Sequence, residues 1–277
     1  MAAAMDRRTF LRRTVAGGAA LGVAGATGLA LAQGGVRISR HEVPFAHAPI
    51  LAPGRRLRVA QLTDIHVGWG TATETLRTAA AEARLVQPDL LVLTGDYLNH
   101  SLAELETLRH WVRGLPRPCV ATFGNHDHWS GVLGIRRMLE QEGIATLANE
   151  SLVLDVAGQP LRIVGVDDGF SGHDDVAAAF RHVTRADEAL VLNHDPKVAD
   201  KIARTGARLV LSGHTHGGQF DLPGLTAALA TVAGIRYLKG WYLIGETRLY
   251  VSCGIGSSVA AGRNGSTASE LAIFELG

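Results

Sequence analysis

Short apolar runs alternate with longer amphipathic stretches in the first half of the chain. The runs are typical of buried strands because four or more neighbouring positions are mostly apolar. Between them, apolar residues recur every three or four positions, which predicts helices, the first ending before Pro88. The predicted strands are Leu57–Leu62, Leu90–Thr94 and Cys119–Phe123, and the predicted helices cover residues 73–86 and 102–113. This alternation predicts βαβ units and a largely parallel sheet with helices on it.

The second half has a different pattern. Two apolar stretches joined through Gly158 predict a hairpin, a short helix follows near 174–182, and two more buried strands come next. The last apolar stretches predict a mostly antiparallel sheet. The strands expected here are Ser151–Val156, Leu161–Val166, Ala189–Leu192, Leu209–Ser212, Trp241–Ile244, Arg248–Val251 and Leu271–Leu276. A single α/β domain with two facing sheets flanked by helices accounts for this order.

Five of the predicted strands stop at a polar segment. The segments are Asp64-Ile65-His66, Gly95-Asp96, Gly124-Asn125-His126-Asp127, Asn193-His194 and Gly213-His214-Thr215-His216. Because the carboxyl ends of parallel strands point to one edge of a sheet, these segments are expected to converge. They offer carboxylates, an amide and imidazoles without a thiolate, a donor set that suits Mn, Fe or Zn and is large enough for two ions.

The composition agrees with a metal site and excludes other classes. The chain has 277 residues, 47% of them hydrophobic, which excludes global disorder. It has 12 His and only 2 Cys, so a thiolate cluster is excluded, and Cys119 and Cys253 are expected to be buried thiols. The net charge of +1 gives no electrostatic reason to bind nucleic acid.

Residues 1–32 have the three regions of an export signal: basic residues, an apolar stretch and a small-residue cleavage site ending at Ala32. The pair Arg7-Arg8 before Phe10 resembles twin-arginine signals, which implies the twin-arginine translocase as a transient partner and a periplasmic or cell-envelope location. A retained membrane anchor is the alternative. Because this leader carries +3, the remaining 245 residues carry −2. Residues 33–56 are expected to be irregular.

The five segments together, in the arrangement D-x-H, G-D, G-N-H-D, N-H and G-H-T-H, resemble the calcineurin-like metallophosphoesterases. The resemblance implies a four-layer α/β/β/α sandwich of two mixed sheets over residues 57–277. It also implies two divalent metal ions bridged by Asp96, and His126 as the acid or phosphate donor rather than a ligand, with orientation of Asn125 as its alternative role. The implied ligands are Asp64, His66, Asp96 and His216 for one ion, and Asp96, Asn125, His194 and His214 for the other.

The implied activity is hydrolysis of phosphodiester or pyrophosphate bonds by a metal-bridging hydroxide. Exported bacterial enzymes that resemble UDP-2,3-diacylglucosamine pyrophosphatases are the most similar subgroup. Phosphoprotein phosphatases of the superfamily have G-D-x-x-D-R-G where this chain has Asn99 and His100, which disfavours a phosphoprotein substrate. A phosphomonoesterase or nucleotidase is the alternative enzyme, and a non-catalytic metal-binding envelope protein is the alternative of another class.

Three features outside the five segments are left with two interpretations each. His100 either contacts phosphate or faces solvent, and His128 either lines the substrate pocket or is exposed. The apolar stretch between Gly218 and Trp241 is either a loop packed on its own core or a cap for lipid-linked substrates at a membrane surface.

Overall fold

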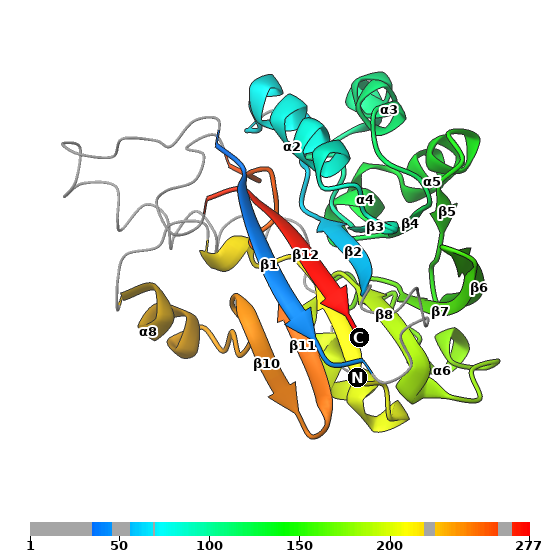
Figure 1. Cartoon of the computed structure of the whole chain (residues 1–277). Coiled ribbons are helices and arrows are strands. Elements are labelled where there is room, and N and C mark those ends of the chain that lie inside the picture. The colour runs from blue at the N-terminus through cyan, green and yellow to red at the C-terminus, as the bar shows by residue number, and fades with distance from the viewer. Residues whose placement is uncertain (1–34, 46–55, 69, 219–224, 260–267) are drawn as a thin grey trace. The chain divides into compact units, whose positions relative to one another are not determined.

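The computed structural model describes residues 35–45, 56–68, 70–218, 225–259 and 268–277 (Figure 1). The leader, with the signal and the translocase expected from it, lies outside these residues. Within them the chain forms two sheets of six strands each, ordered β1-β12-β2-β3-β4-β5 and β10-β11-β9-β8-β7-β6. Both sheets are mixed, which confirms the predicted fold class.

The first sheet is built around the parallel strands β2, β3 and β4. Its members are β1 (Arg37–Val43), β2 (Leu57–Leu62), β3 (Leu90–Thr94), β4 (Cys119–Thr122), β5 (Ala145–Thr146) and β12 (Glu270–Leu276). The second sheet contains β6 (Glu150–Val156), β7 (Gln159–Val166), β8 (Ala189–Asn193), β9 (Leu209–Ser212), β10 (Gly240–Ile244) and β11 (Thr247–Val251). Strands β7, β8 and β9 are parallel, and β6 and β7 form the predicted hairpin.

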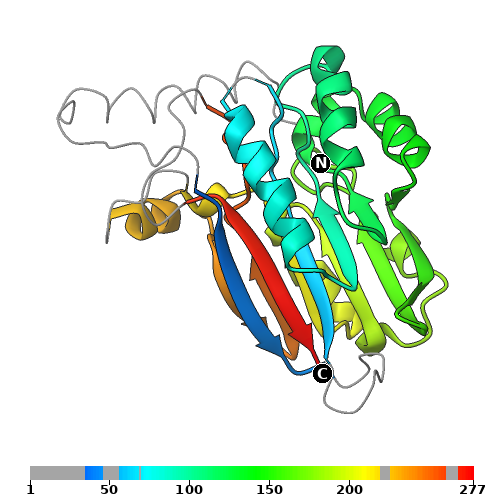
Figure 2. The same cartoon turned by 45° about the horizontal axis from the view of Figure 1, so that its top comes forward.

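Helices α2 (Thr73–Leu85), α3 (Leu105–Arg113) and α5 (Val132–Gln141) cover the outer face of the first sheet, and α6 (Val176–Ala179) and α7 (Ala199–Ile202) that of the second. The remaining helices are α4 (Asn125–Ser130) and α8 (Leu225–Val232). Short 3₁₀ turns lie at Leu102–Glu104, Ala186–Glu188, Pro196–Val198, Ala203–Thr205 and His216–Gly218. In Figure 2, α2 (cyan) lies along the face of the first sheet.

Three buried clusters fill the spaces between four layers. Leu91 and Leu93 of β3 face α2, α3 and α5, whereas their neighbours Leu90 and Val92 face the other sheet. On the second sheet Val191 faces α6 and α7. Because side chains alternate between the two faces of a strand, continuous apolar runs are needed in strands buried on both sides. The layers are therefore helices, sheet, sheet and helices.

Two expectations about the chain ends are wrong. The segment 33–56 contains β1, which pairs in parallel with β12 from Arg37 opposite Glu270 to Val43 opposite Leu276 (Figure 1). The last three strands do not share one sheet: β10 and β11 extend the second sheet, whereas β12 lies inside the first, antiparallel to β2. Strand sequences encode a buried face but not the partner strand, so these pairings require the tertiary structure.

Candidate metal centre

The five polar segments meet at one edge of the two sheets, where backbone hydrogen bonds join them. Asp64 N donates to Gly95 O (3.0 Å) and Gly213 N donates to His194 O (3.1 Å), linking neighbouring strands within each sheet. His214 N lies 3.1 Å from both carboxylate oxygens of Asp64, a contact between the sheets. The positions of these segments are therefore set by main-chain contacts as well as by their side chains.

Five residues of these segments have a left-handed backbone. The φ angles are 52° at Asp64, 47° at His66, 58° at Asp96, 74° at His214 and 52° at His216. Residues with a Cβ adopt this region rarely and at a cost, and such residues concentrate at functional sites. The surrounding fold therefore holds these side chains in positions that the isolated backbone disfavours.

The side chains form three overlapping groups whose donor atoms lie within 4.8 Å of one another. The groups are Asp64, His66 and His216; His66, Asp96 and His126; and Asp96, His194 and His214. Within the first, the Nε2 atoms of His66 and His216 are 3.1 Å apart, and His216 Nε2 is 3.4 Å from Asp64 Oδ1. Convergent nitrogen and carboxylate donors of this kind are typical of transition-metal sites.

Asp96 lies between the first and the third group. Its Oδ2 atom is 3.2 Å from His194 Nε2 and 3.6 Å from His66 Nε2. Burial alone would raise the pKa of Asp96, but His194, His126 and His66 hold it well below the ordinary value. Burial would likewise lower the pKa of His194, which the Asp96 carboxylate raises well above its ordinary value. The Asp96 carboxylate therefore lies close to imidazoles of both the first and the third group.

Asn125 supplies a further buried donor. It begins α4, and among the described residues its Oδ1 atom has no hydrogen-bond partner. An amide oxygen buried without a partner is costly, unless a group such as a cation occupies its lone pairs. This observation and the carboxylate and imidazole donors around Asp96 fit divalent cations.

His126 is held by the main chain of a different segment. Its Nδ1 atom is 2.6 Å from the backbone carbonyl oxygen of Asn99, and its backbone N donates to Asp96 Oδ1 at 2.8 Å. A carbonyl can only accept, so Nδ1 carries the proton and Nε2 is the atom available for proton transfer. The His126 ring is partly exposed, unlike those of His66 and His194.

A comparison with known families identifies this arrangement. Residues 57–218 match the model of the calcineurin-like phosphoesterases, a segment that contains all five polar segments. The chain belongs to this family. It is therefore a metal-dependent phosphoester hydrolase, as the five segments predict.

Two curated relatives agree with this assignment, and a solved structure is similar to the chain. An uncharacterized metallophosphoesterase of Bacillus subtilis, YkuE, is 30% identical over 72% of this chain and 72% of its own. The phosphodiesterase YaeI of Escherichia coli is 29% identical over 72% of this chain and 75% of its own. The solved structure of TT1561 of Thermus thermophilus superposes with a TM-score of 0.49 at 13% identity, covering 72% of this chain and 90% of that one.

Asp127 of this phosphoesterase fastens two of the segments together. Its carboxylate accepts from the backbone N atoms of Asp96 (2.8 Å), Tyr97 (2.8 Å) and Gly124 (2.9 Å). Burial, with the nearby Asp96 carboxylate, raises the pKa of Asp127 to about 7, against the effect of these donors. The sequence leaves open whether Asn99 or Asp127 orients His126; the contact is to the Asn99 main chain.

Asp167 and Asp168 are missed by the sequence reasoning. They follow β7 directly and reach the same edge as the five segments. Asp167 Oδ1 lies 2.8 Å from His128 Nε2, and Asp168 accepts from the backbone N and the hydroxyl of Ser171. The signal was available, because the strand Leu161–Val166 also ends at a polar pair. His128 is half-buried, and its ring stacks on that of His173 at 3.8 Å.

The segment 252–257 after β11 is also part of this edge. Ile255 N donates to Thr63 O (2.9 Å) and Gly256 N donates to Asp64 O (2.6 Å). Gly254 has a φ of 74°, and a Cβ atom there would lie 2.6 Å from Asp64 Cβ. These glycines carry no chemical group, so the sequence offered no sign that they support the Asp64 segment.

The remaining sequence candidates lie as follows. His100 is exposed, and its ring centroid is 5.9 Å from that of His126. The stretch after Gly218 is not a loop throughout, because Leu225–Val232 form α8; Phe220 and Leu222 lie outside the described residues.

Cys119 and Cys253 are buried free thiols, as expected. Within the described part of the chain, none of the helices has both the length and the apolarity that crossing a bilayer requires.

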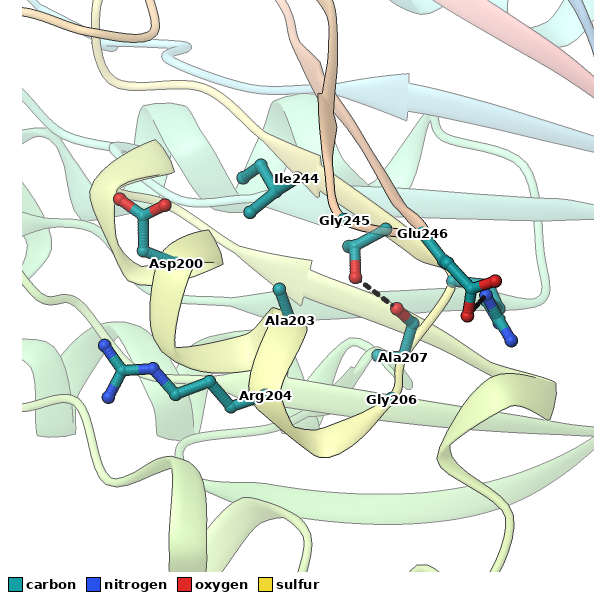
Figure 3. A pocket seen from close by; sticks show the side chains of 10 residues that line it. Asp200, Ala203, Arg204, Gly206, Ala207, Ile244, Gly245 and Glu246 are labelled. Carbon is teal, nitrogen blue, oxygen red and sulfur yellow. Dashed lines mark hydrogen bonds and ion pairs between the residues drawn. The ribbon is translucent and has the colours of Figure 1, made fainter.

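A cavity of about 270 Å³ lies away from the metal edge (Figure 3). It is lined by residues around Ala207 and Gly245, near the contact from Thr247 Oγ1 to Ala207 O (2.6 Å). Ala207 comes before β9, whereas His214 and His216 come after it. The cavity is therefore at the opposite end of the strand from the candidate ligands.

Proposed function

We propose that this protein hydrolyses phosphodiester or pyrophosphate bonds with two divalent metal ions, for which Mn, Zn and Fe fit the donors. The observation that carries the proposal is the position of Asp96, whose Oδ2 atom lies 3.6 Å from His66 Nε2 and 3.2 Å from His194 Nε2, which belong to different donor groups. A carboxylate shared between two donor groups is what two cations about 3.5–4 Å apart require. A site for a single ion has no need of such a bridge.

The proposed ligand sets divide between the two sides of Asp96. One ion would be held by Asp64, His66, Asp96 and His216, and the other by Asp96, Asn125, His194 and His214. When bound, two such ions supply a water nucleophile that ionises near neutral pH, and they neutralise charge on the phosphate. The surrounding fold holds five residues of these segments in a left-handed backbone conformation, which fixes the direction of their side chains.

His126 is the proposed general acid. Nδ1 donates to the Asn99 carbonyl, so Nε2 is the ring nitrogen that faces the reaction, and it donates to the leaving oxygen from the imidazolium, in which both nitrogens carry a proton. Its partial exposure supports contact with substrate.

The test replaces Asp96 by Ala and measures metal content per chain together with hydrolysis of a chromogenic diester. We expect fewer than two ions per chain and loss of turnover, whereas Asp155→Ala, at an exposed position near the end of β6, changes neither. The proposal is falsified if two ions and hydrolysis both survive the loss of Asp96. A panel of mono- and diesters at equal enzyme concentration distinguishes a phosphodiesterase from a phosphomonoesterase or nucleotidase.

The place of action is proposed from the leader. Arg7-Arg8, the apolar stretch and the small residues up to Ala32 support export by the twin-arginine route, with a mature chain that begins near Gln33 at the cell envelope. N-terminal sequencing of the exported protein is the test. A chain that still begins at Met1 in the envelope fraction would show a retained anchor instead.

A lipid-linked substrate is the second proposal for this site. Leu225 and Val232 of α8 are exposed, at 43% and 87%, on the segment that follows the His216 turn. An apolar stretch that follows a candidate ligand in the sequence and exposes apolar side chains supports an apolar partner such as a membrane surface. Deleting residues 222–238 should then reduce hydrolysis of a lipid diphosphate far more than that of a soluble diester; equal losses would contradict a lipid-specific role.

A further inference from the structure

A row of neighbouring imidazole and aromatic rings connects the candidate ligands to residues outside the ligand set. Successive ring centroids lie 4.7 to 6.2 Å apart along a path from one side of Asp96 to the other. The path runs through His66, His126, Trp129, Phe170, His214 and His194. Trp129 and Phe170 are its only members without an ionisable group. These two side chains therefore form an apolar section in a row of rings that otherwise consists of imidazoles.

These two side chains reach the site from different sheets. Trp129 is at the end of α4, the helix that begins with Asn125 and His126, and Phe170 is in the loop after β7. Trp129 is 40% exposed and Phe170 is half-buried. Each contacts one of the two partly exposed imidazoles, with centroids 4.9 Å apart for Trp129 and His126 and for Phe170 and His214. The apolar section therefore lies where the site opens to solvent.

The two rings form a corner. Their centroids are 6.2 Å apart and their planes are inclined by 70°. A flat ring placed in such a corner can stack on one face and direct its edge at the other, which are the two geometries that aromatic pairs prefer. A flexible alkyl chain gains only area from the same surface.

We propose that Trp129 and Phe170 are a subsite for a planar aromatic group on the leaving side of the substrate. This inference rests on the proposed function, because it places the group relative to His126. The leaving oxygen accepts a proton from His126 Nε2, so the group bonded to that oxygen begins beside the ring packed against His126. Aryl esters and nucleoside esters share this chemistry.

The test uses non-hydrolysable phosphonates on the metal-loaded protein, with affinities measured by calorimetry. Inorganic phosphate and methylphosphonate report on the metal centre, and phenylphosphonate and cyclohexylphosphonate compare a flat ring with a saturated one. We expect phenylphosphonate to bind about tenfold more tightly than cyclohexylphosphonate, the scale of one stacked ring. A nucleoside 5′-phosphonate then distinguishes a nucleobase from a simple aryl group.

Variants locate the preference. Trp129→Leu should remove most of the preference for phenylphosphonate and leave the affinities for phosphate and methylphosphonate unchanged, whereas Trp129→Phe should retain it. Phe170→Leu should have a smaller effect of the same kind. The matched control is Trp241→Leu, because Trp241 is 39% exposed and is on β10, outside the ring path.

Two results would overturn the subsite. Phenylphosphonate could bind no more tightly than cyclohexylphosphonate, or Trp129→Leu and Phe170→Leu could weaken all four ligands equally. Failure of the proposed function looks different: phosphate and methylphosphonate would then not bind to the metal-loaded wild type.

Discussion

His126 Nδ1 lies 2.6 Å from the main-chain oxygen of Asn99, the residue that stands where the phosphoprotein phosphatase motif G-D-x-x-D-R-G has its second aspartate. A carbonyl fixes the tautomer as a carboxylate does, but it brings no negative charge to stabilise the imidazolium. The contact also does not depend on the side chain at position 99.

The first prediction follows because the contact to His126 uses the main chain of Asn99 and not its side chain. Asn99→Ala keeps the carbonyl, so kcat for a chromogenic diester should stay within about threefold of wild type, whereas His126→Ala should lower it about 10²–10⁴-fold with metal content retained. Steady-state kinetics and metal analysis on the same preparations check both values. A large loss in Asn99→Ala with normal metal content would show that the side chain orients the ring.

The second prediction concerns Asp127, which accepts from three backbone N–H groups of two ligand segments. Asp127→Ala leaves these buried donors without an acceptor and should lower the free energy of unfolding by about 3 kcal/mol or more, since each unpaired buried group costs about 1–3 kcal/mol. Denaturant titration of the metal-free protein is the measurement. Asp155→Ala, which removes one exposed contact to Gly158 N, is the control and should cost less than about 1 kcal/mol.

The third prediction is a pH dependence at His128. Burial lowers the pKa of this imidazole, but the hydrogen bond to Asp167 and the negative charges of Asp167, Asp168 and Asp127 together outweigh burial, so the net pKa is raised above 6.5. A raised histidine pKa stabilises the folded state below the unfolded value, and the contribution disappears as pH rises through the folded value. Asp167→Asn should therefore destabilise the protein more at pH 6 than at pH 8.

Histidine NMR titration checks the cause directly. The His128 pKa should fall in Asp167→Asn. It should stay unchanged in the control Asp174→Asn, which removes another carboxylate from the loop after β7, one that contacts Lys201 of α7. An equal fall in both variants would assign the effect to general charge rather than to the contact with Asp167.

The fourth prediction uses two glycines with the same backbone. Gly254 and Gly143 have φ angles of 74° and 75°, but a Cβ atom would lie 2.6 Å from Asp64 Cβ at the first and have nothing within 4 Å at the second. Both Ala variants should lose about 1–2 kcal/mol from the left-handed backbone. Gly254→Ala should in addition displace Asp64 and lower metal affinity, measured by calorimetry; equal affinities would contradict the supporting role of segment 252–257.

The central strands could be predicted because each is buried on both faces. Leu90–Thr94 and Ala189–Asn193 have no exposed position, so their apolar runs are continuous. Strand β1 could not be predicted, because five of its seven positions in Arg37–Val43 are polar or charged, and its partner β12 lies more than 200 residues away. Local sequence carries a burial pattern, whereas strand pairing depends on the whole chain.

The candidate ligands could be predicted because their chemistry is visible in the sequence and their strand ends share one edge. The contacts that hold these ligand segments in place could not be predicted from the sequence. The carbonyl of Asn99 and the close approach of Gly254 to Asp64 involve the backbone, which every residue has. Asp167 had a visible signal, but its partner His128 is on a helix of the other half of the fold.

Strand β12 has a consequence for synthesis of the protein. It lies between β1 and β2, and β1 pairs with no other strand of the described residues, so the first sheet stays open until β12 is translated. Ribosomes add about 5–20 residues per second. The edge of β2 that pairs with β12 therefore stays without this partner for seconds while the roughly 200 intervening residues are added.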